Sequence, residues 1–198
     1  VGSEMCIRDS EYTALPTNEE HQLLDYCMEN TTTQEAQLNG YSTGIIFKAT
    51  YAPKQVYVLK QDNSGFEVQN YTNGETFYSY ANVLYKSKQD IAKFYGIDEN
   101  SELIKVYNGD GSKGATCYYK YWIRHMNNSN NEDMGIMEFA IVRNNVYKLS
   151  VNKVNDLGDP DDIIDPDNPD ETSKFYLEVK VSIQPWVCLL YTSDAADD

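Results

Sequence analysis

The sequence holds few residues at spacings that support chemistry. Its two histidines, His21 and His125, lie far apart, and neither stands in an H-E-x-x-H pattern or in a pair at metal-ligand spacing. No G-x-S-x-G motif marks a nucleophile at a strand-to-helix turn. These patterns predict no catalytic residue, no cofactor and no enzyme. The alternative left open is a hydrolase whose paired carboxylates come from distant strands.

A glycine-rich stretch over 109–114 (GDGSKG) superficially resembles a phosphate-binding loop. It lacks the G-K-[ST] ending, and it precedes a strand pattern where a phosphate loop needs a helix. We therefore interpret it as a hairpin turn.

The most acidic segment covers residues 156–171, with eight acidic side chains and no basic one. Its carboxylates suit calcium, which prefers hard oxygen ligands, and the weak candidate ligands are Asp159, Asp161, Asp165 and Asp167. The spacing does not fit an EF-hand, because a loop starting at Asp165 places Asp170 where glycine is required. We expect no metal here, and a solvated loop that charge repulsion extends and leaves disordered at its tip.

Composition sets the class of protein. The chain has 198 residues, of which 41% are hydrophobic, enough for one domain with a core. Its net charge is −15, from 31 acidic and 16 basic residues, which argues against nucleic acid and anionic membrane surfaces as partners. No apolar run approaches the length of a spanning helix, so no direct membrane insertion is expected. A content of 17 Tyr against 6 Phe favours an exported β-domain.

The elements that would position any site are mostly strands. A short helix is predicted between a Ser87 cap and Gly96, and residues 17–30 are ambiguous. Alternation and turn signals predict strands over 43–52, 55–60, 66–71, 75–80, 103–107, 115–125, 136–143, 146–154 and 175–183. Short strands without a βαβ rhythm predict an all-β fold, an antiparallel β-sandwich with one short helix.

Two strand patterns carry candidate surfaces. In the last strand, the side chains of one face are apolar: Phe175, Leu177, Val179, Val181 and Ile183, with Trp186 following Pro185. In the strand over 115–125, Tyr118, Tyr121 and Trp122 suit stacking on sugars, although cross-strand packing explains them as well. Arg124 and His125 end that strand and are candidates for a site, although a polar strand end is the commoner explanation for such a pair.

Both ends of the chain fit nothing around them. Residues 1–10 and 188–198 resemble translated sequencing-adapter DNA, so we expect non-native ends and one domain over 11–187. Of the four cysteines, only Cys27 and Cys117 then remain in the domain. They either pair in an oxidising compartment or stay as buried thiols.

Several stretches in order resemble the C-terminal domain of fimbrilin, the shaft subunit of type V pili of Bacteroidales-type bacteria. These stretches are Asp25–Thr31, Phe47–Pro53, Thr76–Tyr80, Tyr118–His125, Met134–Leu149 and Val179–Trp186. The most specific are YWIRH and MGIMEFAIVRNNVYKLSV. The resemblance spans about 25–187 and includes the acidic loop over 156–171, where that family carries a similar insert.

The resemblance implies a transthyretin-like β-sandwich, exported through the periplasm as a lipoprotein precursor and displayed in a fimbrium on the outer membrane. In that family a protease removes the first strand, and the C-terminal strand of another subunit fills the groove. The implied partners are other fimbrial subunits, as a homopolymer with anchor or tip proteins, together with host or bacterial surface ligands. The implied interface is the strand over 175–183 with Trp186.

The sequence departs from that family at its ends. No signal peptide, lipobox cysteine or cleavable first strand is visible, so the expected N-terminal domain is not represented, and the suspect segment begins soon after Trp186. The alternative function is a surface carbohydrate- or protein-binding β-sandwich module, assisted by calcium at the acidic loop.

Overall fold

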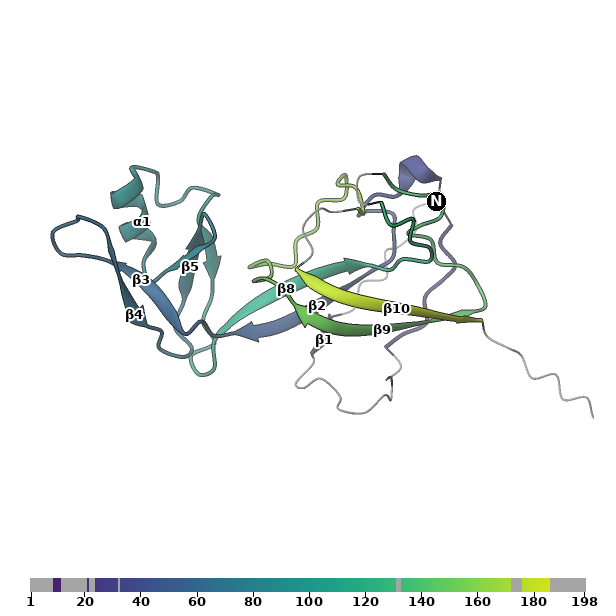
Figure 1. Ribbon diagram of the computed structural model, residues 1–198, viewed down its shortest axis with the longest axis horizontal. Helices are drawn as coiled ribbons and strands as arrows, with labels where there is room; N and C mark the ends of the chain where they lie inside the picture. Colours follow the sequence, from purple (N-terminus) through teal and green to yellow (C-terminus); the bar gives the residue numbers. More distant parts are fainter. Residues whose placement is uncertain are drawn as a thin grey trace, which may run out of the picture.

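The computed structural model describes residues 9–11, 21, 24–31, 33–130, 133–171 and 176–185. Figure 1 shows two lobes joined by the long pair β2 and β8. The chain is mostly β, rich in antiparallel pairs, with one α-helix and one short 3-10 helix, Gln34–Ala36, in the described residues. This confirms the predicted all-β class and is consistent with a β-sandwich.

One lobe, here called the sandwich lobe, consists of a three-stranded sheet and a two-stranded ribbon. The sheet contains β1 (Asp9–Glu11), β2 (Gly44–Tyr51) and β8 (Ala115–Trp122), and the ribbon contains β9 (Asn145–Val154) and β10 (Leu177–Pro185). Asp9 and Ser10, assigned from sequence to a foreign end, thus pair with β2. The ribbon lies over the sheet because the apolar faces of both layers share one core.

The other lobe, here called the small lobe, is formed by residues inserted between β2 and β8. Its sheet has the order β4-β3-β6-β5-β7. The strands are β3 (Gln55–Leu59), β4 (Phe66–Asn70), β5 (Phe77–Tyr80), β6 (Val83–Tyr85) and β7 (Lys105–Tyr107).

The helix α1 (Lys88–Tyr95) confirms the predicted helix and both of its caps. The Asp90 amide donates to the Ser87 hydroxyl, with 3.3 Å between the two atoms. Gly96 ends the helix in the left-handed conformation, at φ 68°. The Asp90 carboxylate accepts a bond from the Leu59 amide, which ties α1 to β3.

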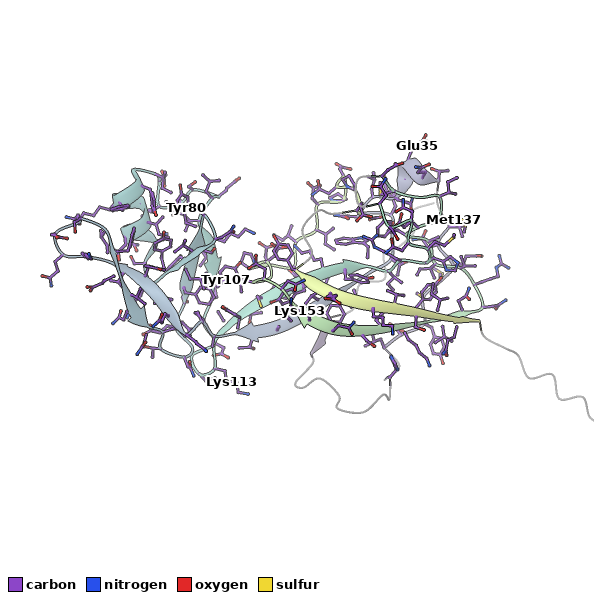
Figure 2. All side chains as sticks on the ribbon, in the orientation of Figure 1. Glu35, Tyr80, Tyr107, Lys113, Met137 and Lys153 are labelled. Carbon is purple, nitrogen blue, oxygen red and sulfur yellow. The ribbon has the colours of Figure 1, made fainter. Side chains whose placement is uncertain are left out.

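The two lobes share a core. Val56, Phe77 and Tyr107 from the small lobe pack with Ala115, Cys117 and Tyr119 from β8 and with Leu177 from β10. The rings of Phe77 and Tyr107 stack, with 4.9 Å between centroids. Figure 2 places Tyr107 where the lobes meet. Side-chain packing, rather than the connecting chain alone, therefore sets how the lobes sit together.

The predicted strand over 136–143 is wrong. Residues 136–139 form a turn, and Ile141 makes only an isolated bridge with Asn30. The apolar run misled because its charged member points inward: Glu138 is 1% exposed, whereas Ile136 is 74% exposed. An ion pair of Glu138 with Arg124 supplies the reason, since a buried carboxylate needs a cation.

The acidic loop over 156–171 is held against the protein along its length. Asp159 exchanges both backbone hydrogen bonds with Tyr118, at 2.7 and 2.8 Å, and so extends the β8 edge. At the far end, the Gly40 amide donates to the Pro166 carbonyl at 3.0 Å. The expected solvation is confirmed, since residues 161–163 and 165–169 are exposed. The expected disordered tip is wrong, because main-chain bonds anchor the loop on both sides of its tip.

Candidate assembly surface

The β10 strand carries the predicted interface row, and the row faces inward. Leu177 is 8% exposed and packs in the shared core, where Val179 joins it, while Val181 and Ile183 are half-buried. Phe175 and Trp186, the other predicted interface residues, lie outside the described residues. The described members of the row therefore contact their own subunit, and a partner would meet the backbone edge of the strand.

The ribbon has one apolar and one polar face. Opposite β10, strand β9 places Val151 against Val179, Leu149 against Val181 and Tyr147 against Ile183. A bulge between Glu178 and Val179 shifts the register, and beyond it the apolar pairs continue. The alternate β10 side chains, Glu178, Lys180, Ser182 and Gln184, are exposed.

In the part of the chain that the structure describes, two strand edges of the sandwich lobe lack a full strand partner. Among the described residues, β10 pairs with β9 alone, so its second edge has no strand partner. Strand β2 pairs with β8 over residues 44–51 on one side. On its other side, β1 covers only Ile46, Phe47 and Lys48. Unpaired main-chain donors and acceptors of this kind are the groups that strand addition uses.

A buried ionic cluster closes the end of the sandwich lobe. Nη1 of Arg124 lies 2.8 Å from Oε1 of Glu138, and Nη2 lies 2.6 Å from Oε1 of Glu171. The guanidinium also sits 4.8 Å from the ring centre of Phe139. The cluster joins the end of β8, the turn over 136–139 and the end of the acidic loop.

A second contact reinforces the same corner. The Ser42 hydroxyl donates to Oδ2 of Asp170, and the Asp170 amide donates to the Gln37 carbonyl at 3.1 Å. Burial raises the pKa of the Asp170 carboxyl to about 6, against the opposing effect of the Ser42 bond. The Gln37 side-chain oxygen accepts from the Phe139 amide at 2.8 Å. The segment over 37–42 thereby pins the acidic loop to the turn over 136–139.

The weak calcium candidates do not converge. Asp159 pairs with Lys105 at 3.2 Å and with Lys120 at 3.3 Å. Asp161 lies 3.9 Å from Lys120, and an Asp165 oxygen accepts from the Asp167 amide at 3.2 Å. Within the described part of the chain, no three His, Cys, Asp or Glu side chains are grouped as a metal ion requires. Lysines and backbone amides are the partners of these carboxylates.

The aromatic candidates on β8 form no exposed patch. Tyr118, Tyr121 and Trp122 are all half-buried, and the Trp122 indole donates to the Asn39 carbonyl at 3.3 Å. His125 Nδ1 lies 2.8 Å from the Tyr147 hydroxyl, which ties the end of β8 to β9. This strand end is structural.

The two cysteines of the domain are separate thiols in the structure, Cys27 exposed and Cys117 buried. Desolvation raises the pKa of the Cys117 thiol. Its sulfur lies 3.6 Å from the Ala49 carbonyl, between paired strands. Cys117 therefore behaves as a small core residue.

The sequence pattern did not single out the partners of Arg124. Glu138 and Glu171 lie 14 and 47 residues from Arg124 along the chain. Ser42 lies 128 residues from its partner Asp170, so only folding joins each pair. One signal existed: a lone glutamate inside the apolar run IMEFAIV indicates a buried charge that needs a cation.

Comparison with known families gives one match. Residues 112–192 match the sequence model of the major fimbrial subunit protein type IV, fimbrillin, C-terminal domain. This confirms the resemblance for the part that contains β8, β9, β10 and the acidic loop, while the resembling stretches before residue 112 lie outside it. No curated protein matches the chain. Within the described ranges, no helix is long and apolar enough to cross a membrane.

Proposed function

We propose, on the premise that residues 112–192 form a fimbrillin C-terminal domain, that this chain is a structural subunit of a bacterial surface fimbria that polymerises by strand addition. The observation that carries the proposal is the outer edge of β2, which β1 covers over only three residue pairs. The main-chain groups of Ala49 and Tyr51 point toward β8, whereas those of Thr50 point to the outer edge, where no described residue pairs with them. A neighbouring subunit supplies the added strand.

Strand addition at β2 explains how contacts would be specific. Main-chain hydrogen bonds to β2 would supply affinity, and alternate side chains of the incoming strand would enter the apolar layer beside β10. The donor and acceptor surfaces differ, so the contact does not close on itself and extends into a filament. The row Leu177, Val179, Val181 and Ile183 supports the acceptor by holding the ribbon over the sheet.

The setting of such a subunit follows as part of the proposal. Its partners are copies of itself together with anchor or tip subunits, and it displays the fimbria outside the cell after export through the periplasm. The filament supports adhesion to host or bacterial surfaces. No catalytic step belongs to this function.

Neighbouring proline substitutions on β2 test the acceptor edge. Successive amides of a strand point to opposite edges. Ala49→Pro therefore removes a ladder bond to β8, whereas Thr50→Pro removes an outward donor. We expect Ala49→Pro to lower the free energy of unfolding. Thr50→Pro should keep near-normal stability and form no filaments, as measured by light scattering and negative-stain electron microscopy of the full chain.

The proposal has two clear ways to fail. A wild-type chain that stays monomeric at millimolar concentration would remove the basis for polymerisation. Filaments of normal length from the stable proline variant would show that the β2 edge is not the acceptor.

A further inference from the structure

The two lobes enclose a cleft of about 600 Å³ that the fimbrial role does not use. Its small-lobe wall includes Asn82 and Leu103, and its sandwich-lobe wall includes Tyr51, Asn155 and Tyr176. We propose that this cleft binds a short neutral glycan. The volume lies within the range of small-molecule sites, which is about 300–1,000 Å³.

The walls of the cleft are held in place before any ligand arrives. The Tyr107 hydroxyl at its base donates to the Gly158 carbonyl at 2.8 Å. Beside it, Lys105 pairs with Asp159 at 3.2 Å, again across the lobes. The core around Phe77 fixes the same junction. A site whose walls are preformed loses little conformational entropy on binding.

Large apolar side chains lie exposed around this cleft. Leu103 is 66% exposed, Val154 is 56% exposed and Tyr51 is 36% exposed. Tyrosine combines an apolar ring face with a polar tip, which suits the C–H face and the hydroxyls of a sugar ring. The convergence of these side chains from both lobes gives a ligand apolar faces to cover.

The polar groups of the lining match hydroxyls rather than charges. Asn82, Asn155 and Ser79 carry amide or hydroxyl groups that both donate and accept, as sugar hydroxyls do. The charged lining residues are Lys105, paired with Asp159, and Asp156, whose oxygen accepts from the Leu157 amide at 2.8 Å. With one charge of each sign and a chain net charge of −15, an anionic ligand is disfavoured.

The turn at the rim carries backbone strain. Ala81 and Asn82 join β5 to β6 with φ of 48° and 63°, the left-handed region that favours Gly or Asn. Ala81 adopts it without a compensating side chain, and strain of this kind clusters at ligand sites. A peptide strand fits less well, because the neighbouring edge strand β7 offers only Lys105–Tyr107 for pairing.

Binding of the full chain to an immobilised array of neutral hexose and N-acetylhexosamine oligosaccharides tests the proposal. We expect at least one to bind, with its Kd then measured by titration calorimetry. Asn82→Gly removes the amide while glycine retains the left-handed turn, and Tyr51→Ala removes the ring. Each should raise the Kd at least tenfold.

Matched controls make the result specific. Asn63 is also left-handed, at φ 55°, and Tyr57 is 40% exposed with one neighbouring ring at 6.1 Å, as Tyr51 has; neither lines the cleft. Asn63→Gly and Tyr57→Ala should leave the Kd unchanged. Absence of binding to the whole array, or binding that the cleft variants do not weaken, overturns the proposal. So does selective binding of anionic glycans or peptides at the cleft. None of these outcomes depends on filament formation.

Discussion

The two lobes bury their interiors by different means. In the small lobe, aromatic rings pack around Phe66, whose ring centre lies 4.8 Å from those of Tyr85 and Phe94. In the sandwich lobe, strand ladders are closed at one end by Arg124 between two buried carboxylates. Aromatic rings can pack against a small sheet in several orientations, whereas a buried ion pair is stable only when its hydrogen-bond geometry is close to ideal.

The two lobes also differ in the role that we propose for each. The family match covers the sandwich strands β8, β9 and β10 and only the last few residues of the insertion between β2 and β8. The sandwich lobe carries the open edges proposed for assembly, and the small lobe adds one wall of the cleft proposed for recognition. Substitutions that affect one lobe alone, or both, test that separation.

The largest effect is expected where both lobes share a residue. Phe77 is 0% exposed and contacts the rings of Tyr51, Tyr71 and Tyr107. Phe77→Ala should lower the free energy of unfolding by about 3–5 kcal/mol, because the surrounding rings leave a cavity. Urea unfolding measures this, with Phe94→Ala, 41% exposed, as the mild control. Separate unfolding transitions for the wild-type lobes would contradict a shared core.

The next effect tests the ionic closure of the sandwich lobe. Arg124→Met leaves Glu138 and Glu171 buried without their cation and should cost about 3–4 kcal/mol. Arg143→Met removes an exposed pair with Glu29 and should lower the free energy of unfolding far less, because solvent screens that pair.

Replacing the whole cluster sharpens this test. Arg124→Met combined with Glu138→Leu and Glu171→Leu should recover most of the loss, because no uncompensated charge remains. If the triple variant is as unstable as Arg124→Met, the hydrogen-bond geometry, and not the charge, holds this corner.

A smaller effect depends on pH. The folded pKa of Asp170, about 6, is above the ordinary value of 3.8, so folding favours its protonated form. Its stabilising contribution is therefore fully present below pH 3.8 and is lost as the pH rises through about 6, by at most about 3 kcal/mol.

Asp170→Asn isolates this effect, since the amide oxygen still accepts from Ser42. The difference in unfolding free energy between the variant and the wild type should grow in favour of the variant from pH 4 to 6.5. A difference that stays constant over that range would show that Asp170 keeps the same pKa in the folded and unfolded chain.

The sequence predicted the small lobe better than the far end of the sandwich lobe, for a physical reason. Small-lobe elements are adjacent in the chain and carry local signals, such as Gly96 after α1 and the turn over 61–65. Strand β6, of three residues, was not predicted. The alternation of β10 was also readable, and its apolar row faces the core as the period of two requires.

What the sequence could not give are contacts between distant segments. The sequence pattern places Glu138 in a strand, and only the folded structure shows that Arg124 lies beside it. The sequence predicts a disordered tip for the acidic loop, and only the folded structure shows the main-chain bonds to Tyr118 and Gly40 that anchor it. The same holds for the outer edge of β2, because pairing partners are not encoded locally.

The smallest effect is expected at the helix cap that the sequence identified. Ser87→Ala removes the hydroxyl that accepts from the Asp90 amide and should cost about 1 kcal/mol. Ser182→Ala, on the exposed face of β10, should change stability by less than about 0.5 kcal/mol. Hydrogen exchange of α1 amides should quicken in the first variant alone, while exchange in β9 and β10 stays constant. Faster exchange in the ribbon as well would contradict a local effect, because it would mean that the shared core transmits the loss of the cap to β9 and β10.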